Sequence, residues 1–442
     1  MSPTLGDRFT IDTSGQSVRH AMSSRLRAIA FFLPQFHPIP ENDAWWGKGF
    51  TEWTNVTKAR PQFPGHYQPH VPADLGFYDL RLADTREAQA DLARQYGIHG
   101  FCYYHYWFTG RSILQRPFEE VLISGRPDFP FCLCWANENW TRVWDGSERE
   151  ILLEQRYSEA DDVAHIKALL PAFRDPRYIR VHDKPIFLVY RTGLLPDPAR
   201  TASVWRQVAR TEGVGELYLV RVESHGAIDV DPRTIGFDAA VQFSPDLGKI
   251  GKYRFRSPLH VALARAGLLS RGFIENNVGD YNVAKAFALN RPEPEFVHFK
   301  CVNPSWDNTA RRRPAWILLD STPSAYEHWL KEAVRRTIVH RRGDEQLVFI
   351  NAWNEWAEGN HLEPDIKWGH AYLEATRRAL ATASAFVPST DGDARAIGPV
   401  VDPVEHSFIK QRYWNARASV QQFITKSMQE LAIFKYLGRR SR

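Results

Sequence analysis

The chain has 442 residues, of which 43% are hydrophobic, 24% charged and 13% aromatic. These proportions are typical of a globular protein with a core of its own. The formal net charge is +5, but residues 406–442 hold eight Lys/Arg and a single acid, Glu430. The rest of the chain carries no positive excess, so we expect no nucleic acid as a partner.

Two kinds of membrane-related segment are missing from the sequence. No N-terminal stretch combines basic residues, an apolar core and a small-residue cleavage site, and no run of about 18 apolar residues occurs. These observations exclude a membrane-spanning helix and predict a cytoplasmic protein.

Residues 1–22 show no periodicity and predict a disordered arm. Residues 23–383 then contain eight apolar runs, which we expect to be strands. They are Leu26–Leu33, Ile98–Tyr104, Pro130–Ala136, Pro185–Tyr190, Leu217–Val222, Ala239–Phe243, Val297–Val302 and Leu347–Ala352. Continuous apolar runs, rather than alternating ones, are typical of strands buried on both faces.

Apolar residues at helical spacing lie between most of these strands. The expected helices are Leu82–Gln95, Ala160–Leu170, Ala202–Thr211, Asn277–Ala288, Ser324–His340 and Ala371–Ala383. Eight alternating units predict an α/β fold, a single (β/α)8 TIM barrel with loop insertions. An open doubly wound sheet is the alternative, but no strand is followed by a glycine-rich phosphate loop, since Gly213-Val-Gly215 lacks a third glycine.

All four cysteines lie within predicted strands: Cys102, Cys132, Cys134 and Cys301. A reduced, buried thiol behaves as a small hydrophobe. Zinc would instead need ligands on turns at Cys-x-x-Cys-like spacing, whereas Cys132 and Cys134 alternate along a strand. We therefore expect no metal and no other cofactor.

Polar and aromatic residues recur where the predicted strands end, which is where a barrel has its active site. Aromatic rings flanked by hydrogen-bonding groups suit sugars, whose flat C–H faces are rimmed by hydroxyls. The expected substrate-binding residues are Gln35, His37, Tyr104, His105, Trp107, Trp135, Asn137, Glu138, Trp306, Asp307, Trp353 and Asn354. For each of them a structural role is the alternative.

Three further features near these ends stay open. Asp307 and Asn308 could bind hydroxyls or form an Asx-turn. Glu52 could reach the mouth of the barrel or cap a loop. The run Arg311-Arg312-Arg313 could bind a diphosphate, but we favour a solvated surface run.

Glu355 and Glu358 follow the last predicted strand and are flanked by Trp353 and Trp356. Glycosidic bond chemistry needs two carboxyl groups whose pKa values are pushed apart by their surroundings, and adjacent aromatic rings can desolvate one of them. The two glutamates are therefore the candidate catalytic residues. The alternative is a pair of acids at a helix N-terminus, favoured by the helix dipole.

The C-terminal part differs in character from the rest. Residues 384–405 contain Pro, Ser, Gly and Asp without periodicity and predict a linker. In residues 406–442, apolar side chains share one helical face among Lys and Arg: Val420, Phe423, Ile424, Leu431 and Phe434. This helical tail could lie on an anionic membrane at its inner face, or pack back on the barrel.

The stretch Ala352-Trp-Asn-Glu-Trp-Ala-Glu-Gly359 resembles the Phe-Asn-Glu-Trp-His-Glu-Gly motif of the glycoside hydrolase family 99 endo-α-mannosidases. The whole barrel region is similar to the WbsX family of lipopolysaccharide-biosynthesis proteins, described as family 99-like. Further blocks that carry this resemblance are Phe32–His37, Trp45–Val56, Tyr103–Phe108, Cys134–Trp140 and Pro304–Arg312.

The resemblance implies a role for each glutamate. Glu355 matches the base that deprotonates the sugar's 2-hydroxyl, and Glu358 matches the general acid, in a retaining route through a 1,2-anhydro sugar. Ala357 replaces the histidine of the family 99 motif. Endo-mannosidase specificity should therefore not be assumed.

Together these features predict an enzyme that cleaves or transfers glycosidic bonds with retention in the biosynthesis of a cell-surface polysaccharide, such as O-antigen or capsule. Its expected partner is an oligosaccharide or lipid-linked glycan. The alternatives are a nucleotide-sugar-dependent glycosyltransferase and a non-catalytic carbohydrate-binding barrel. Against the transferase, neither Asp229-Val-Asp231 nor Asp391-Gly-Asp393 follows an apolar strand as a metal-binding Asp-x-Asp should.

Overall fold

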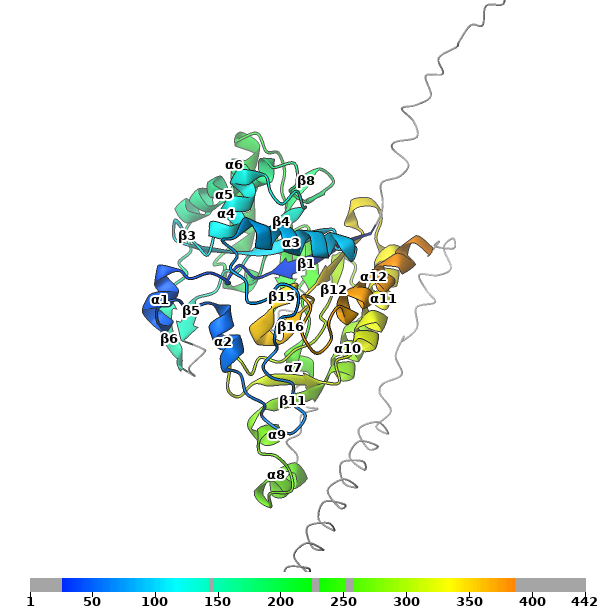
Figure 1. The fold of residues 1–442 in the computed structure, drawn as a ribbon. Coiled ribbons are helices and arrows are strands. Elements are labelled where there is room, and N and C mark those ends of the chain that lie inside the picture. The colour runs from blue at the N-terminus through cyan, green and yellow to red at the C-terminus, as the bar shows by residue number, and fades with distance from the viewer. Residues whose placement is uncertain (1–25, 143–146, 225–229, 251–257, 386–442) are drawn as a thin grey trace, which may run out of the picture.

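The structure is a computed structural model that describes residues 26–142, 147–224, 230–250 and 258–385 (Figure 1). The predicted arm of residues 1–22, most of the linker and the tail of residues 406–442 lie outside the described residues. Within the described ranges, no helix is both long and apolar enough to cross a membrane.

Eight parallel strands close into a barrel, as the sequence predicts. They are β1 (Arg27–Phe32), β2 (Gly100–Phe108), β4 (Phe131–Trp135), β8 (Lys184–Val189), β9 (Tyr218–Glu223), β10 (Ala239–Gln242), β12 (Val297–Val302) and β14 (Leu347–Ile350). Each strand pairs with the next along the chain, and β1 also pairs with β14, where Ala28 is opposite Val348. The sheet therefore has no open edge, which excludes the doubly wound alternative.

Helices surround the barrel (Figure 1). They are α1 (Pro40–Trp46), α2 (Glu52–Lys58), α3 (Ala83–Gln95), α4 (Arg116–Ser124), α5 (Glu159–Arg174), α6 (Pro198–Thr211), α7 (Leu247–Ile250), α8 (Pro258–Arg265), α9 (Gly272–Glu275), α10 (Tyr281–Leu289), α11 (Pro323–His340) and α12 (Ala371–Ala385). Short 3-10 turns are η3 (Thr192–Leu194), η4 (Pro232–Ile235), η6 (Gly343–Glu345) and η7 (Trp356–Glu358). Helices α5 and α6 pack side by side, as do α11 and α12.

Short strands in the connections form small additional pairings. They are β3 (Arg111–Ile113), β5 (Trp140–Arg142), β6 (Ser147–Leu153), β7 (Arg180–Val181), β11 (Asn277–Asp280), β13 (Trp316–Leu319), β15 (Asn354–Glu355) and β16 (Asn360–His361). The pair β5–β6 and the pair β15–β16 are antiparallel. Both belong to loops at the carboxyl ends of barrel strands, the end at which a barrel builds its site.

Local sequence explains where several of the helices begin. The side chains of Ser158, Asp197 and Thr322 accept hydrogen bonds from backbone amides two or three residues into α5, α6 and α11. The prediction of a helix from Asn277 was wrong for its first residues, because Asn277–Asp280 pair with β13 as strand β11. The Asp280 side chain caps α10 instead, which begins at Tyr281.

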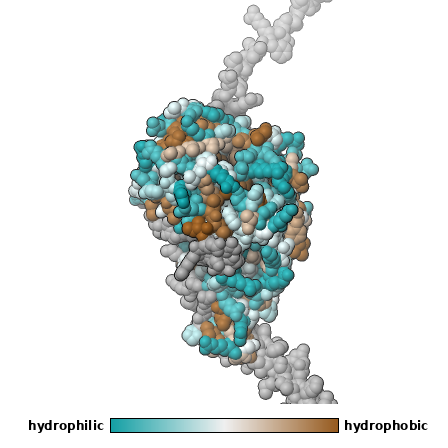
Figure 2. All heavy atoms as spheres, turned by 90° about the vertical axis from the view of Figure 1, so that its left-hand side faces the viewer, coloured by the Kyte–Doolittle hydropathy of each residue, from teal (hydrophilic) through white to brown (hydrophobic). Residues whose placement is uncertain are grey.

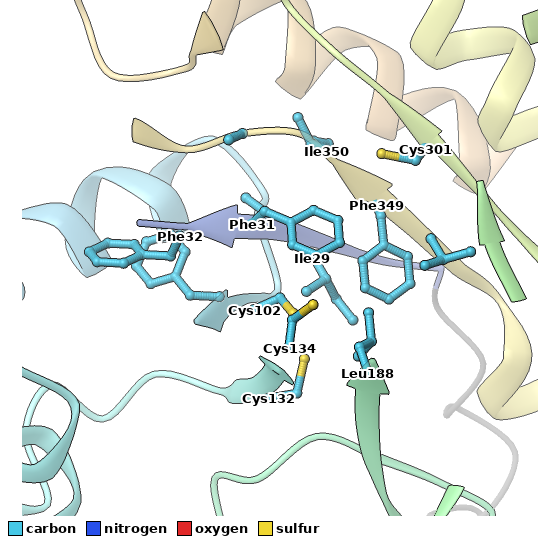
Figure 3. Packing of buried hydrophobic residues seen from close by; sticks show 14 of the residues in the cluster. Ile29, Phe31, Phe32, Cys102, Cys132, Cys134, Leu188, Cys301, Phe349 and Ile350 are labelled. Atoms are coloured by element: carbon cyan, nitrogen blue, oxygen red, sulfur yellow. The ribbon is translucent and has the colours of Figure 1, made fainter. Parts of the chain in front are cut away.

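The barrel interior is filled by apolar side chains, including Ile29, Phe31, Leu188 and Phe349 (Figure 3). All four cysteines are free and buried in this core region, as the sequence predicts, and burial raises the pKa of the Cys102 thiol well above its ordinary value. Phe32 points to the outer side, against Phe101 and Tyr103. The barrel is thus a packed scaffold whose chemistry must lie in its loops.

Candidate active site

One guanidinium holds three carboxylates together at the carboxyl end of the barrel. Arg311 donates to Glu358 Oε1 and to Glu355 Oε2, each at 2.9 Å, and its Nε donates to Glu52 Oε1 at 2.9 Å. Glu52 is fully buried, whereas the side chain of Glu358 is 21% exposed. We call these four residues the carboxylate cluster. Its one solvent-facing carboxylate is that of Glu358.

The members of the carboxylate cluster lie in separate connections between the barrel strands. Glu52 is the first residue of α2, and its backbone amide donates to the carbonyl of Gln35, just after β1. Arg311 lies in the loop between β12 and β13. Helix α2 packs against the turn η7, where the rings of Trp53 and Trp356 lie 5.5 Å apart. The cluster is therefore a product of the tertiary fold.

A second buried glutamate fixes the segment that carries Glu355 and Glu358. Glu363 accepts hydrogen bonds from Trp356 Nε1 at 2.6 Å, Gln89 Nε2 at 2.7 Å and the Tyr78 hydroxyl at 2.9 Å. Asn354 joins the same segment to the end of β1, because its side chain bonds both the amide and the carbonyl of Leu33. These contacts hold the backbone on both sides of Glu355.

The glycine after Glu358 is required by geometry. Gly359 has φ +54, and a Cβ there would lie 3.1 Å from both the Cβ and the carbonyl oxygen of Asp307. The close approach lets the Asp307 amide donate to the Glu358 carbonyl at 2.6 Å. The loop after β12 thereby supports the backbone of Glu358.

Electrostatics in the carboxylate cluster favour bound protons. Burial raises the pKa of Glu355 to about 8; Arg311 opposes this rise, while Glu358 and Glu52 add to it. Burial raises the pKa of Glu358 as well. One guanidinium cannot neutralise three carboxylates, so the cluster retains a proton near neutrality that belongs to the coupled group rather than to one residue.

Two members of the cluster, Arg311 and Glu358, line a pocket of about 310 Å³. Aromatic rings make up much of its wall, with Trp45 and Trp140 5.8 Å apart and Tyr106 and Trp140 5.3 Å apart. The complete lining is Gln35, Trp45, Trp46, Tyr106, Glu138, Asn139, Trp140, Thr141, Leu152, Asn308, Arg311, Arg312 and Glu358. Figure 2 views the molecule from the side that carries α1, β5 and β6, where hydrophilic residues surround an apolar patch.

Among the predicted site residues, Gln35 and Glu138 line this pocket together with Glu358. The Glu138 carboxylate contacts Arg191, and the Gln35 amide nitrogen is buried without a hydrogen-bond partner within the described part of the chain. Tyr104 lies near the cluster, since Glu355 and Glu358 contribute to the raised pKa of its phenol after burial and Tyr190. These residues are in place to contact a ligand.

Other predicted binding residues face the layer between barrel and helices. Trp107 Nε1 donates to Asp161 of α5 at 3.1 Å, His105 Nε2 lies 3.0 Å from His165 Nε2, and Trp135 packs on Trp205 of α6. Successive strand side chains point to opposite faces. Residues 105 and 107 therefore point outward, toward α5, while Tyr104 and Tyr106 point to the other side. The structure thus gives Trp107, Trp135 and His105 structural contacts, and their binding role stays a prediction.

Several further predictions gave way to structural roles. Asn137 is fully buried and bonds the backbone of Arg191, Asn354 bonds Leu33, and His37 Nδ1 lies 3.0 Å from the carbonyl of Pro34. Burial lowers the pKa of His37 to about 4. Trp353 is fully buried against Phe101. These side chains shape the loops from behind the pocket.

Asp307 and Trp306 line a different cavity, described below. The Asp307 carboxylate is occupied by His66 at 2.6 Å and Gln68 at 2.7 Å, and it accepts from the Thr309 amide at 3.0 Å. The last contact is the Asx-turn that the sequence allowed. Hydrogen bonding with His66 helps to lower the pKa of Asp307 against the effect of burial.

The expectation of a solvated Arg311-Arg312-Arg313 run was wrong for its first member. Arg312 and Arg313 are exposed, but the Arg311 side chain is only 14% exposed and sits at the centre of the cluster. The sequence analysis also missed Trp45, Trp46 and Trp140 as pocket residues. The signal was available, because all three stand in the blocks that carry the family resemblance.

Comparison with known proteins agrees with the blocks seen in the sequence. A family model described as "Glycosyltransferase WbsX" matches residues 28–376. The "Uncharacterized protein WxcX" of Xanthomonas campestris pv. campestris strain B100 is 47% identical over 356 residues, which are 80% of this chain and 50% of that protein. The protein of the same name in strain ATCC 33913 matches to the same extent. The chain thus spans about half the length of the curated relatives it matches.

Solved structures with a similar arrangement include a GH99 endo-alpha-mannosidase from Bacteroides thetaiotaomicron, at 14% identity and TM-score 0.48, covering 81% of this chain and 99% of that one. A "Glycoside hydrolase-like protein" has 15% identity and TM-score 0.48, covering 85% and 97%. The family model, which matches well over half of the chain, confirms the family predicted from the sequence blocks. This chain belongs to the WbsX glycosyltransferase family.

Proposed function

We propose that this protein is a glycan-active enzyme of polysaccharide processing that breaks and re-forms glycosidic bonds with retention, with Glu355 and Glu358 as its reacting carboxyl groups. The observation that carries the proposal is the carboxylate cluster, in which two glutamates share the Arg311 guanidinium at the wall of an aromatic pocket. Membership of the WbsX family supports a glycan as the substrate.

The proposed first step couples two proton transfers to one displacement. The Glu355 carboxylate takes the proton of the sugar's 2-hydroxyl while that oxygen bonds to the anomeric carbon. The bond from the anomeric carbon to the leaving oxygen breaks, and Glu358 gives its proton to that oxygen. The sugar becomes a 1,2-anhydro sugar.

The second step reverses these roles. Glu358, now ionised, takes a proton from the incoming water or alcohol, whose oxygen attacks the anomeric carbon. The epoxide opens and Glu355 returns its proton to the 2-oxygen. Two displacements at one carbon retain its configuration.

The route needs an ionised Glu355 and a protonated Glu358, whereas burial favours a proton on Glu355 in the free protein. Because the two carboxyl groups interact strongly, they titrate as a pair, and the proton belongs to the pair rather than to one of them. We propose that binding of the sugar shifts this proton to Glu358, the more exposed of the two glutamates, which lies next to the leaving oxygen.

Transfer to a glycan hydroxyl is the second candidate outcome of the same chemistry, and the family description favours it. A nucleotide-sugar route through an Asp-x-Asp metal site finds less support. Asp231 is bound by Arg233 at 2.6 Å on an exposed turn, while Asp229 and the Asp391–Asp393 motif lie outside the described residues. We propose that the acceptor is a growing or lipid-linked polysaccharide at the inner membrane face.

Glu358→Gln tests the proposal. A panel of bacterial O-antigen and capsule oligosaccharides is incubated with the full chain, alone and with short acceptors, and the products are identified by mass spectrometry. The variant should lose roughly 10³-fold in turnover, the share typical of a general acid. Its binding of the same oligosaccharide should persist.

Glu138→Gln is the matched control, because Glu138 lines the same pocket but contacts Arg191 rather than Arg311. It should keep its turnover within about tenfold. Undiminished turnover in Glu358→Gln would refute the assigned chemistry.

A further inference from the structure

A second cavity, of about 390 Å³, adjoins the segment that carries the catalytic glutamates. Gly359 and Asp307, which support Glu358 from behind, form part of its wall, together with Trp306 and Tyr372. Two imidazoles and one carboxylate also line it, those of His70, His361 and Asp365. We call these three residues the rear triad. The proposed reaction uses none of them.

The donor atoms of the rear triad converge on one point. His70 Nδ1 lies 2.9 Å from His361 Nε2, and His361 Nε2 lies 4.0 Å from Asp365 Oδ2. One donor atom from each residue lies within 4.8 Å of those of the other two. All three side chains are buried, with relative exposures of 8%, 6% and 2%.

Neighbouring groups orient two of the three donors. The Nδ1–H of His361 donates to the Glu363 carbonyl at 2.8 Å, which leaves the Nε2 lone pair facing His70. One carboxylate oxygen of Asp365, Oδ1, accepts from the amides of Lys367 at 3.0 Å and Trp368 at 2.6 Å. Its other oxygen, Oδ2, therefore faces the imidazoles. Outer contacts of this kind are typical of metal ligands.

The charges around the triad permit a cation. The exposed Lys367 ammonium lies 4.5 Å from the centre of the Tyr67 ring, over its face. Asp307, on the same cavity wall, adds a second carboxylate.

The separations fit a small transition-metal ion. Ligands about 2.0–2.1 Å from a tetrahedral zinc lie about 3.3 Å from one another. Two of the three separations, 2.9 Å and 4.0 Å, bracket that value, and the third is within 4.8 Å. Small side-chain shifts would therefore be needed to bring all three donors to bonding distance of one ion. Two histidines and one carboxylate select a divalent ion such as Zn²⁺ over Mg²⁺ or Ca²⁺, which prefer oxygen.

We propose that His70, His361 and Asp365 bind a divalent transition-metal ion, Zn²⁺ in chemical class, with its remaining position open to the 390 Å³ cavity. Sequence reasoning expected no metal, because it considered cysteines and not two histidines separated by 291 positions. The site is distinct from the carboxylate cluster and does not depend on the proposed reaction.

The ion would brace the segment that carries the glutamates. The His361 ring stacks on Trp356, with ring centres 3.8 Å apart and planes 14° apart, and Trp356 lies between Glu355 and Glu358 in the chain. Fixing His361 through an ion to His70 therefore limits movement of that segment. We expect metal binding to raise the melting temperature by mass action on the folded state.

The experiment measures metal directly on the full chain. The purified protein is stripped with a chelator, dialysed against Zn²⁺, and assayed by plasma mass spectrometry and thermal unfolding. We expect about one zinc per chain, and a Co²⁺-loaded sample with the visible absorption of a four- or five-coordinate ion. His70→Gln and Asp365→Asn should each weaken Zn²⁺ binding by roughly 100-fold or more.

His66→Gln is the matched control, because His66 lines the same cavity but bonds Asp307 at 2.6 Å and lies outside the triad. It should retain the zinc. If the wild-type chain binds no zinc, His70 simply hydrogen-bonds His361 and the proposal is overturned. Equal zinc binding by the folded His70→Gln variant would also overturn it. The wild-type Co²⁺ spectrum decides the matter even if the variants do not fold.

Discussion

Two buried glutamates at the same end of the barrel contact an arginine each, yet their environments shift their pKa values in opposite directions. Glu223, at the end of β9, contacts Arg291, which donates to Oε1 at 2.9 Å, and His298 lies 3.0 Å from Oε2. Although burial acts against ionisation, these hydrogen bonds lower the pKa of Glu223 to about 2. Glu355, after β14, has a pKa raised to about 8.

The difference lies in the number of carboxylates for each cation. Glu223 contacts two donor groups, those of Arg291 and His298, whereas Glu355 shares the single guanidinium of Arg311 with Glu52 and Glu358. A buried ion pair with enough donors is a structural brace, and a buried group with surplus carboxylates keeps a proton that it can donate. The comparison separates a glutamate with a structural role from one that we propose to take part in the reaction, on the same scaffold.

Substitution of Arg311 should have the largest effect on stability and on turnover. Arg311→Met leaves three buried carboxylates without their cation, so the free energy of unfolding should fall by about 3–5 kcal/mol. Turnover should also fall by roughly 100-fold, because Glu355 and Glu358 lose their common anchor. Denaturant unfolding and product analysis measure both.

The nearby Arg313→Met serves as control, since Arg313 is exposed and does not line the pocket. Its unfolding free energy should change by about 0.5 kcal/mol or less. An Arg311→Met protein as stable as the wild type would show that the guanidinium does not hold the cluster.

Glu223→Gln should have the next largest effect, and on stability alone. The substitution removes the charged acceptor of Arg291 and His298, so the unfolding free energy should fall by about 1.5–3 kcal/mol. Turnover per folded molecule should stay unchanged. A loss of turnover comparable to that of Glu358→Gln would contradict the distinction between Glu223, with a structural role, and the glutamates proposed to react.

The pH dependence of stability should sharpen the comparison with smaller effects. Glu355 has a folded pKa of about 8, above its ordinary value of 4.5, so the stability it contributes is complete below pH 4.5 and is lost as pH rises through 8. Glu223 has a folded pKa of about 2, so its contribution is present above pH 4.5 and is lost as pH falls through 2.

Glu355→Gln should therefore gain stability relative to the wild type between pH 5 and pH 9, as followed by melting temperature. Glu223→Gln should approach the wild type in stability as the pH falls below 4.5. If the difference in melting temperature between Glu355→Gln and the wild type stays constant from pH 5 to pH 9, then Glu355 is ionised over this whole range. That result would contradict its raised pKa.

The strands could be predicted because a strand buried on both faces leaves a continuous apolar run that needs no partner to be recognised. The place of Glu355 and Glu358 after the last barrel strand could also be predicted, while their catalytic role stays a prediction. Arg311 could not. Its burial depends on Glu52, 259 positions away, and local sequence shows only three successive arginines.

Binding residues at strand ends were predicted less well, because proximity to a strand end does not say which face a side chain takes. Alternation along β2 would have separated Tyr104 and Tyr106 from His105 and Trp107. Trp45 of α1 and Trp140 of β5 approach each other from two separate connections of the barrel, a contact that no periodicity encodes. Loop residues therefore had to be located by the structure.

The central claim is that the carboxylate cluster holds a proton on a catalytic glutamate at neutral pH. Infrared difference spectroscopy of the wild type against Glu355→Gln tests it most directly, because a protonated carboxyl has a C=O stretch that a carboxylate lacks. We predict that this band is present at pH 7 in the wild type, titrates away with a midpoint of about 8, and is missing from the variant. A wild-type spectrum at pH 7 without a protonated carboxyl assignable to Glu355 or Glu358 would contradict the account.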